Sequence, residues 1–211
     1  MTVFFSPAED RPWPFEPLKP FGYDIIVIDP PWRWKGWSEK GNWKGPNSKY
    51  DTMTLDEIAV LPVGHLMRTG AVLWCWCTWP MIGKQAEIIK GWGFTVKTGG
   101  CWAKRTPSGK FRVGTGYILR SVCEPFLIAT IGDDHGFGDG RARNFIETIE
   151  DAALDGVARE HSRKPEEAYR LVEDLTPNAF RADVFARQRR PGWDTFGLEA
   201  DKFEEAPASA R

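Results

Sequence analysis

The sequence predicts an α/β fold built around a doubly wound, mostly parallel β-sheet. Residues 23–29 contain the apolar run Ile-Ile-Val-Ile, which is typical of a strand buried on both faces of a parallel sheet. Later apolar runs alternate with stretches in which apolar residues recur every three or four positions. This alternation of strand and helix patterns predicts strand–helix–strand units.

Each element follows from a local pattern. Pro30 and Pro31 end the first strand, because neither has an N–H group to donate to a neighbouring strand. The segment Thr54-Leu55-Asp56-Glu57 has capping-box spacing and begins a short helix. Apolar residues at helical spacing predict helices over residues 81–92 and 165–175. Further strands are expected at residues 71–78, 94–103, 124–131 and 181–186.

The 211 residues are enough for one well-buried core, so we expect a single domain over residues 1–211. Within it, residues 1–20 are rich in proline and predicted to be irregular, and residues 33–50 are predicted to form a long surface loop. The acidic tail, residues 199–211, is expected to be flexible.

The composition, with 42% hydrophobic and 27% charged residues, is that of a globular protein and excludes disorder as the main state. The longest apolar stretch, residues 71–83, is shorter than the roughly 20 residues of a membrane span, and no export signal opens the chain. We therefore expect a cytoplasmic protein without a membrane partner. The four cysteines have neither zinc-ribbon nor disulfide spacing, so no metal is expected, and Cys75 and Cys77 are expected to be buried.

The segment Asp29-Pro30-Pro31-Trp32 carries the strongest chemical signal. The amino group of adenine is a poor nucleophile, because its lone pair is delocalised into the ring. The Asp29 carboxylate and the Pro30 carbonyl can accept hydrogen bonds from both amine hydrogens and stabilise the cation that forms on alkylation. The prolines fix the backbone, and the Trp32 ring is expected to stack on a base that has left its duplex. The alternative is that these residues only form a turn.

These four residues match the catalytic motif of the amino-group adenine methyltransferases, which include the catalytic subunit of the eukaryotic messenger-RNA adenosine methyltransferase and its bacterial and phage relatives. The resemblance covers most of residues 22–197. The other matching segments, in the family's order, are Tyr50-Asp51-Thr52-Met53, Leu73-Trp74 with Thr78, Trp102-Ala103-Lys104, Gly114–Tyr117 with Glu124, His161–Glu166, Phe185-Ala186-Arg187 and Pro191-Gly192-Trp193.

The resemblance implies a Rossmann-like, circularly permuted class I methyltransferase sheet and the cofactor S-adenosylmethionine. It implies that Lys164 meets the cofactor's carboxylate, Arg187 its ribose side and the Asp29 region its amino group. The alternative is that Lys164 is solvated and Arg187 pairs with an acid. In one departure, the family's Gly-Asn-Glu is replaced by Gly197-Leu198-Glu199, which removes a polar contact to the cofactor. The implied cofactor-binding residues are Asp29, Ser162, Lys164, Arg187, Gly197 and Glu199.

The charges are unevenly distributed, although the net charge is −1. Between residues 33 and 49, five basic residues accompany one acid and the tryptophans Trp34, Trp37 and Trp43; between residues 101 and 123, there are five basic residues and no acid. Basic and aromatic residues together suit phosphate neutralisation and base stacking, whereas the alternative is two solvated loops. The expected substrate-binding residues are Lys44, Tyr50, Trp79, Lys104, Gly116, Arg120 and Glu124.

The predicted function is transfer of a methyl group from S-adenosylmethionine to the exocyclic N(6) amine of adenine in nucleic acid. DNA is favoured over RNA because the chain has the compact form of prokaryotic members. With no room for a separate recognition domain, sequence choice must come from the basic loops or from a partner subunit in a homo- or heterodimer.

Two other functions compete with this prediction. The first is a non-catalytic nucleic-acid-binding subunit on the same fold, which Leu198 favours and the intact Asp29–Trp32 motif disfavours. The second is an ATPase, which is disfavoured because the sequence has no G-x-x-x-x-G-K-[ST] loop.

Overall fold

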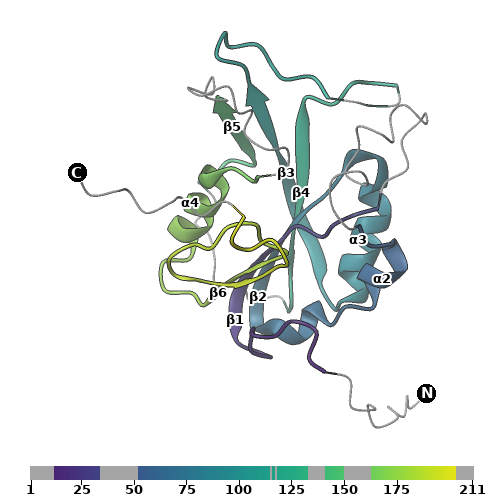
Figure 1. Cartoon of the computed structure of the whole chain (residues 1–211), viewed down its shortest axis with the longest axis vertical. Coiled ribbons are helices and arrows are strands. Elements are labelled where there is room, and N and C mark those ends of the chain that lie inside the picture. Colours follow the sequence, from purple (N-terminus) through teal and green to yellow (C-terminus); the bar gives the residue numbers. More distant parts are fainter. Residues whose placement is uncertain are drawn as a thin grey trace.

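The computed structural model describes residues 12–33, 52–114, 116, 118–132, 141–149 and 163–202. In this part of the chain a curled sheet of seven strands carries helices on both faces (Figure 1). Several residues singled out above lie outside the described residues, namely Trp34, Trp37, Trp43, Lys44, Tyr50 and Ser162.

The sheet has the strand order β5-β3-β4-β2-β1-β6-β7. Strand β1 is parallel to β2 and β6, β3 is parallel to β5, and β6 is parallel to β7, whereas β4 is antiparallel to both β2 and β3. The predicted α/β class with a mostly parallel sheet is therefore confirmed, and the antiparallel strand β4 makes the sheet mixed. The strands are β1 (Tyr23–Ile28), β2 (Met67–Trp76), β3 (Thr95–Arg105), β4 (Cys123–Thr130), β5 (Phe145–Ile149), β6 (Arg181–Val184) and β7 (Trp193–Phe196).

In the described part of the chain, three α-helices cover the two faces of the sheet. Helices α2 (Leu55–Ala59) and α3 (Ile82–Gly91) lie on one face, and α4 (Glu166–Leu175) lies on the other (Figure 1). The predicted capping box at the start of α2 is present, because Thr54 and Glu57 each bond the other's backbone N–H. Two 3-10 helices, η2 (Val63–Leu66) and η3 (Trp79–Met81), flank β2.

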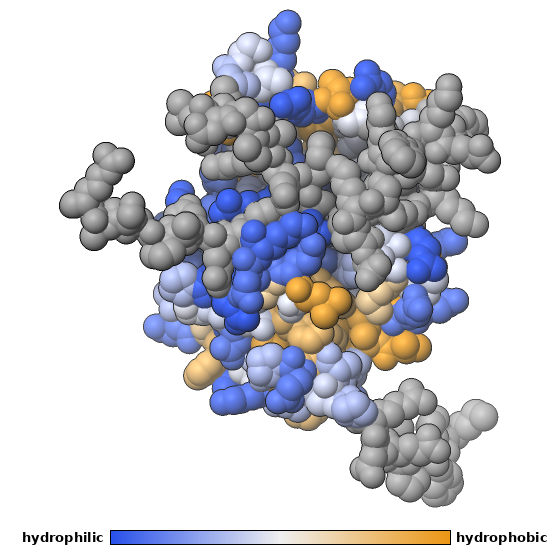
Figure 2. All heavy atoms as spheres, viewed as in Figure 1, coloured by the Kyte–Doolittle hydropathy of each residue, from blue (hydrophilic) through white to orange (hydrophobic). Residues whose placement is uncertain are grey.

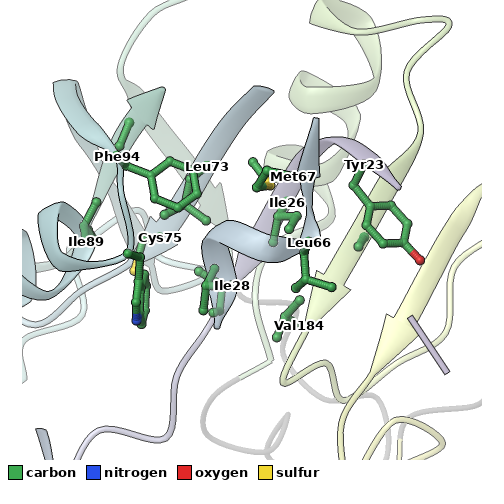
Figure 3. Close-up of a cluster of buried hydrophobic side chains, with 14 of the residues drawn as sticks. Tyr23, Ile26, Ile28, Leu66, Met67, Leu73, Cys75, Ile89, Phe94 and Val184 are labelled. Atoms are coloured by element: carbon green, nitrogen blue, oxygen red, sulfur yellow. The ribbon is translucent and has the colours of Figure 1, made fainter. Parts of the chain in front are cut away.

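Two hydrophobic clusters hold these layers together. Alternate residues of β1 point to opposite faces, so Ile26 and Ile28 join the cluster beneath α2 and α3, while Ile25 and Val27 join the cluster beneath α4. Figure 3 shows the first cluster, where side chains from β1, β2 and α3 meet Val184 of β6. Burial of each large aliphatic side chain contributes about 1.5–3 kcal/mol, so the sheet core fixes the strand ends that carry the site.

The apolar runs predicted β1 to β4 and β6 correctly, and Cys75 and Cys77 are buried as expected. The sequence did not reveal β5 and β7. Both are short and place polar residues between apolar ones, as in Trp193-Asp194-Thr195-Phe196, so neither contains a continuous apolar run. They form because each pairs in parallel with a strand whose position the core already fixes.

The strand directions bring several chain segments to one edge of the sheet. The carboxyl ends of β1, β2, β3, β6 and β7 all lie there, and antiparallel β4 places its first residues at the same edge. Ligands of such sheets bind beyond the carboxyl ends of the parallel strands. None of the helices in the described ranges has the length and apolar character needed to cross a membrane.

Candidate active site at the carboxyl edge of the sheet

Asp29 is the first residue after β1, and backbone hydrogen bonds fix the segment that follows it. The Trp32 N–H donates to the Pro30 carbonyl (2.7 Å), and the Met53 N–H donates to the Pro31 carbonyl (2.8 Å). A carbonyl oxygen has two lone pairs, so the Pro30 carbonyl keeps one for a further donor. The motif is thus held in one conformation, with a carboxylate and a carbonyl next to each other in sequence.

A buried ammonium group connects Asp29 to residues predicted from separate motifs. Lys164 Nζ lies 3.3 Å from Asp29 Oδ1 and 3.0 Å from Glu124 Oε2. Glu124 in turn pairs through Oε1 with Lys104 Nζ (3.2 Å). The first residues of β4, the end of β3 and the segment before α4 therefore meet at the residue that ends β1. The alternative in which Lys164 is simply solvated is wrong, because its side chain is only 11% exposed.

The charges in this cluster shift one another's pKa values. Burial raises the pKa of Asp29, and the Lys164 ammonium offsets this only in part. Burial would also raise the pKa of Glu124, but Lys164 and Lys104 outweigh it and lower the pKa to about 2. Burial lowers the pKa of Lys164, but Asp29 and Glu124 outweigh it and raise the pKa above its ordinary value. Glu124 and Lys164 are charged at neutral pH, and Asp29 has the least stabilised charge of the three.

The position of Trp32 corrects an expectation. Its side chain is only 5% exposed and packs in the core, where the indole N–H donates to the Trp76 carbonyl (3.1 Å). A ring packed in this way has no open face for a base. Burial of the large ring with its N–H paired is favourable. Trp32 therefore ties the Asp29 loop to the end of β2.

Trp79 is placed very differently. It follows β2 in η3, and it alone is exposed among the tryptophans that the structure describes, with 49% of its surface accessible. Its indole N–H donates to the Cys123 carbonyl (3.1 Å), one residue before Glu124. The predicted substrate residues Trp79, Lys104 and Glu124 thus lie together at the carboxyl edge.

The other two predicted substrate residues in the described chain lie in the β3–β4 connection. Arg120 Nε donates to the Gly114 carbonyl (3.2 Å), and a Cβ atom on Gly116 would lie 1.9 Å from the Leu119 carbonyl oxygen. These contacts are local to the connection and do not join the two residues to Asp29. The tight approach explains why glycine occupies position 116.

On the other side of Asp29, a pocket opens between the β6–β7 loop and the start of α4. Arg187 Nε pairs with Glu199 Oε2 (3.2 Å), so the alternative in which Arg187 pairs with an acid is what the structure shows. A Cβ atom at Gly197 would lie 2.3 Å from the Ala186 carbonyl oxygen, which requires glycine at this approach. The pocket is lined by Asp29, Arg163, Lys164, Tyr169, Asp183, Phe185, Ala186, Arg187, Gln188 and Arg190.

An ion-pair network centred on the buried Arg190–Asp183 pair supports this pocket. Arg190 pairs with Asp183 Oδ2 (3.1 Å) and with Glu166 Oε1 (2.9 Å), and its guanidinium lies 3.4 Å from the centre of the Tyr169 ring. Burial raises the pKa of Asp183 to about 7, although the Arg190 charge and a Tyr169 hydrogen bond oppose the rise. Arg190 also donates to the Gln188 carbonyl (3.4 Å), so the network anchors the β6–β7 loop.

The donors and acceptors of this pocket fit S-adenosylmethionine, which carries a carboxylate, an ammonium group and ribose hydroxyls. Arg163 and Lys164 are cations at its border, and Asp29 is an acceptor. The Gln188 Oε1 atom is buried and has no hydrogen-bond partner among the described residues, so it can accept from a ligand. Leu198, at the family's asparagine position, is almost fully exposed and supplies no such group.

Sequence reasoning missed Gln85, Asp183, Gln188 and Arg190. Gln85 gave a signal, because it is a polar residue at helical spacing on the apolar face of α3, and the structure buries it completely. Asp183 lies within a short apolar strand, where a buried carboxylate needs a partner that the sequence does not identify.

The matches to known proteins cover the chain segments that form this site. The family model described as MT-A70 matches residues 23–199. The chain is 27% identical over 199 residues to the type II methyltransferase M.MunI of a Mycoplasma species, covering 84% of this chain and 77% of that protein. It is 25% identical over 191 residues to the human N(6)-adenine-specific methyltransferase METTL4, covering 86% of this chain and 38% of METTL4.

A second human relative is the N(6)-adenosine-methyltransferase catalytic subunit METTL3, which is 26% identical over 183 residues, covering 85% of this chain and 28% of METTL3. The chain therefore spans well under half the length of both human relatives. The MT-A70 match includes the Asp29 motif, the Lys104–Glu124 pair, Lys164 and the β6–β7 pocket. The resemblance seen in the sequence motifs is confirmed, and the chain belongs to the MT-A70 family of N(6)-adenine methyltransferases.

Proposed function

We propose that the protein transfers a methyl group from S-adenosylmethionine to the N(6) amine of adenine in nucleic acid, with DNA as the favoured substrate. The observation that carries this proposal is the pairing of Asp29 with a buried Lys164 between a pocket on one side and an exposed tryptophan on the other. DNA is favoured because M.MunI, of which the chain spans 77%, is a type II methyltransferase, whereas the chain spans 28% of the adenosine methyltransferase METTL3.

The acceptor groups at Asp29 suit an aromatic amine. The Asp29 carboxylate accepts one N–H of the adenine amine, and the free lone pair of the Pro30 carbonyl accepts the other. Both bonds draw the nitrogen lone pair out of conjugation and stabilise the positive charge that develops during alkylation. Lys164 now occupies one oxygen of the Asp29 carboxylate, so the amine is expected to approach the other.

The pocket beside Asp29 is the proposed cofactor site. Lys164 and Arg163 would hold the carboxylate, Asp29 the ammonium group, and Gln188 a hydroxyl or ammonium donor. Arg187 lines this pocket and pairs with Glu199, and Gly197 lies against the backbone of Ala186, another lining residue. When bound, S-adenosylmethionine supplies an electrophilic methyl group on sulfur. We also propose that residues 1–211 form one domain of the Rossmann-like, permuted class I type, because β1 with Asp29 precedes the pocket-forming β6 and β7.

The nucleic-acid side is proposed on the β3–β4 half of the same edge. The end of β3 and the β3–β4 connection carry five basic residues, while Ile118 and Leu119 are largely exposed beside them. Figure 2 shows hydrophilic and hydrophobic residues side by side at the top of the molecule, where Figure 1 places this connection. Such a mixture suits phosphate contacts together with contacts to unstacked bases. The basic residues are Lys104, Arg105, Lys110, Arg112 and Arg120.

The test is methyl transfer from labelled S-adenosylmethionine to adenine-containing DNA and RNA oligonucleotides, followed by nucleoside mass spectrometry. We expect N(6)-methyladenine in DNA, and we expect Asp29→Ala to lower kcat by at least about 10²-fold, the usual loss when a group that stabilises transition-state charge is removed. The melting temperature of the variant serves as its control. Full activity of Asp29→Ala would exclude the proposed role.

The second candidate is a non-catalytic nucleic-acid-binding subunit, which the apolar Leu198 favours. A subunit of this kind need not bind the cofactor. Calorimetry with S-adenosylmethionine, together with the methyl-transfer assay, separates the two functions: binding with methyl transfer favours the enzyme, whereas absence of cofactor binding and of transfer favours the subunit.

A further inference from the structure

Gln85 is an unusual residue for its position. It is completely buried on the inner face of α3, close to the apolar residues Ile82 and Ile89. Burial of an amide group is unfavourable unless hydrogen bonds replace those it made to water. The hydrogen-bond partners of the Gln85 amide therefore indicate its role in the structure.

Both polar atoms of the Gln85 amide bond to one residue. Gln85 Oε1 accepts from the Thr78 N–H (2.9 Å), and Gln85 Nε2 donates to Thr78 Oγ1 (3.5 Å). Thr78 also accepts the Met81 N–H at its carbonyl (3.1 Å), which closes the turn of η3. The backbone N–H, the carbonyl and the hydroxyl of Thr78 are thus all hydrogen-bonded, and these bonds hold the backbone between β2 and α3.

Trp79 follows Thr78 directly, and its side chain is held by a hydrogen bond from the indole nitrogen. The indole N–H donates to the Cys123 carbonyl, which also accepts from Ser121 Oγ (2.7 Å). The ring is therefore fixed by its backbone and by its nitrogen, although half of its surface is open to solvent. An exposed indole normally has rotamer freedom, so holding it in place requires such contacts.

The fixed ring stands beside the charge cluster of the site. Cys123 precedes Glu124, and Glu124 pairs with the Lys164 that also contacts Asp29. Trp32, the tryptophan of the motif, is buried and cannot stack on a base. Trp79 is the exposed indole that the described structure brings to this edge.

We propose that Trp79 is the platform on which the target adenine stacks, and that Gln85 is the positioning residue that orients it. The inference rests on the proposed function and names the residues that select an unstacked base. A base that is extruded from a nucleic acid loses the stacking on its neighbours, so the enzyme must supply another stacking partner. A ring that is already held in place does so without further loss of side-chain entropy. Aromatic stacking of one base changes affinity by about tenfold or more.

The first experiment measures binding rather than catalysis. A single-stranded oligonucleotide carries the fluorescent base 2-aminopurine at the target position, and its fluorescence is followed on titration with the full chain. Stacking on Trp79 is expected to quench the probe. Trp79→Ala should leave the bound probe bright and weaken binding about tenfold, and Trp79→Phe should retain part of the quenching. Phe180→Ala, which removes another exposed ring at the opposite edge of the sheet, is the matched control and should change neither.

The second experiment tests the role of Gln85. Gln85→Met removes both bonds to Thr78 at similar volume and should raise the KM for the oligonucleotide severalfold, with the Kd for S-adenosylmethionine unchanged. Gln85→Glu keeps an acceptor for the Thr78 N–H and should restore part of the loss. If Gln85 acts through Trp79, the double variant Gln85→Met, Trp79→Ala should be no worse than Trp79→Ala. Lys84→Met, on the exposed side of the same helix, is the control.

The outcomes separate this inference from the proposed function. Methyl transfer with unchanged KM and quenching in Trp79→Ala would overturn the inference and leave the function intact. Quenching that depends on Trp79 without any methyl transfer would support the inference and contradict the activity. Multiplicative effects in the double variant would show that Gln85 does not act through Trp79. If Gln85→Met fails to fold, Thr78→Val, which removes the hydroxyl partner, replaces it in the same comparison.

Discussion

The two halves of the carboxyl edge, on either side of Asp29, neutralise their charges in different ways. In the β6–β7 half, Arg190 and Asp183 are 8% and 3% exposed and pair inside the protein. In the β3–β4 half, Lys104 and Glu124 are 25% and 39% exposed, and their pair is partly open to solvent. The fold fixes the first set of charges, whereas the second set remains accessible to a ligand.

This difference in exposure indicates that the two halves bind different kinds of ligand. A pocket framed by internal ion pairs suits one small ligand that always presents the same groups. An edge with exposed basic, aromatic and aliphatic residues suits a polymer whose bases vary. Substitutions in the β6–β7 half should therefore change stability, and those in the β3–β4 half should change nucleic-acid binding.

The largest effect is expected from Arg190→Met. The substitution leaves the Asp183 carboxylate buried without its cation, so the free energy of unfolding should fall. At pH 8, one unit above the Asp183 pKa, proton uptake by Asp183 limits the charge contribution to about 1.4 kcal/mol, and the lost Arg190 contacts with Glu166 and Tyr169 add to it. Lys104→Met, the counterpart in the other half, should cost less than about 1 kcal/mol, because its pair is partly exposed. Denaturant unfolding measures both.

The pH dependence of Arg190→Met provides a further check. Asp183 has a pKa of about 7 in the folded protein, above the ordinary value, so its protonated form is the one that burial favours. Loss of Arg190 raises this pKa further. The penalty of Arg190→Met should therefore be greatest above pH 7 and shrink as the pH falls toward 6. Equal losses for Arg190→Met and Lys104→Met at every pH would remove the distinction between the halves.

The next effect concerns Lys164, which touches both halves. Its ammonium partly offsets the burial that raises the Asp29 pKa, so Lys164→Met should raise that pKa further. Activity is proposed to need the Asp29 carboxylate, and the acid limb of kcat/KM should therefore move to higher pH. The profile is measured at saturating S-adenosylmethionine. Lys164→Arg keeps the charge and should return the acid limb toward its wild-type pH. If the acid limb does not move in Lys164→Met, Lys164 does not influence the pKa of Asp29.

The smallest effect is expected from a single basic residue of the β3–β4 connection. Lys110→Gln should weaken oligonucleotide binding and reduce the slope of log K against log salt concentration by about 0.7, the value for one phosphate contact to a single strand. Lys90→Gln, at the far end of α3, is the control and should leave the slope unchanged. If Lys110→Gln and Lys90→Gln have the same slope, Lys110 does not contact a phosphate of the bound nucleic acid.

The sequence predicted the inner strands and Asp29 because each follows from a local pattern, whereas Lys104, Glu124 and Lys164 were implied by the family resemblance. The run Ile-Ile-Val-Ile fixes β1, and Asp29 at its end needs no tertiary information. Which groups pair with one another could not be predicted, because Lys164, Glu124 and Asp29 are far apart in the chain. Lys164 meets two carboxylates only after β4 and the start of α4 have come to the end of β1.

Which tryptophans are exposed could not be predicted from the local sequence either. Trp32 follows two prolines and precedes a polar segment, which suggests an exposed ring, but a hydrogen bond to the Trp76 carbonyl and packing on the core bury it. Trp79 follows an apolar strand, which suggests burial, yet its bond to Cys123 holds it at the surface. In both residues the partner of the indole N–H, which no local pattern reveals, decides the position.

The reversed direction of β4 has a consequence for how this fold can diversify. Since β3 ends and β4 begins at the same edge, their connection projects from the site and returns to it as a hairpin (Figure 1). Residues can be inserted or exchanged at its tip while the β3–β4 ladder and the opposite half of the edge keep their geometry. New target sequences could thus evolve by changes in one hairpin, without altering the chemistry at Asp29.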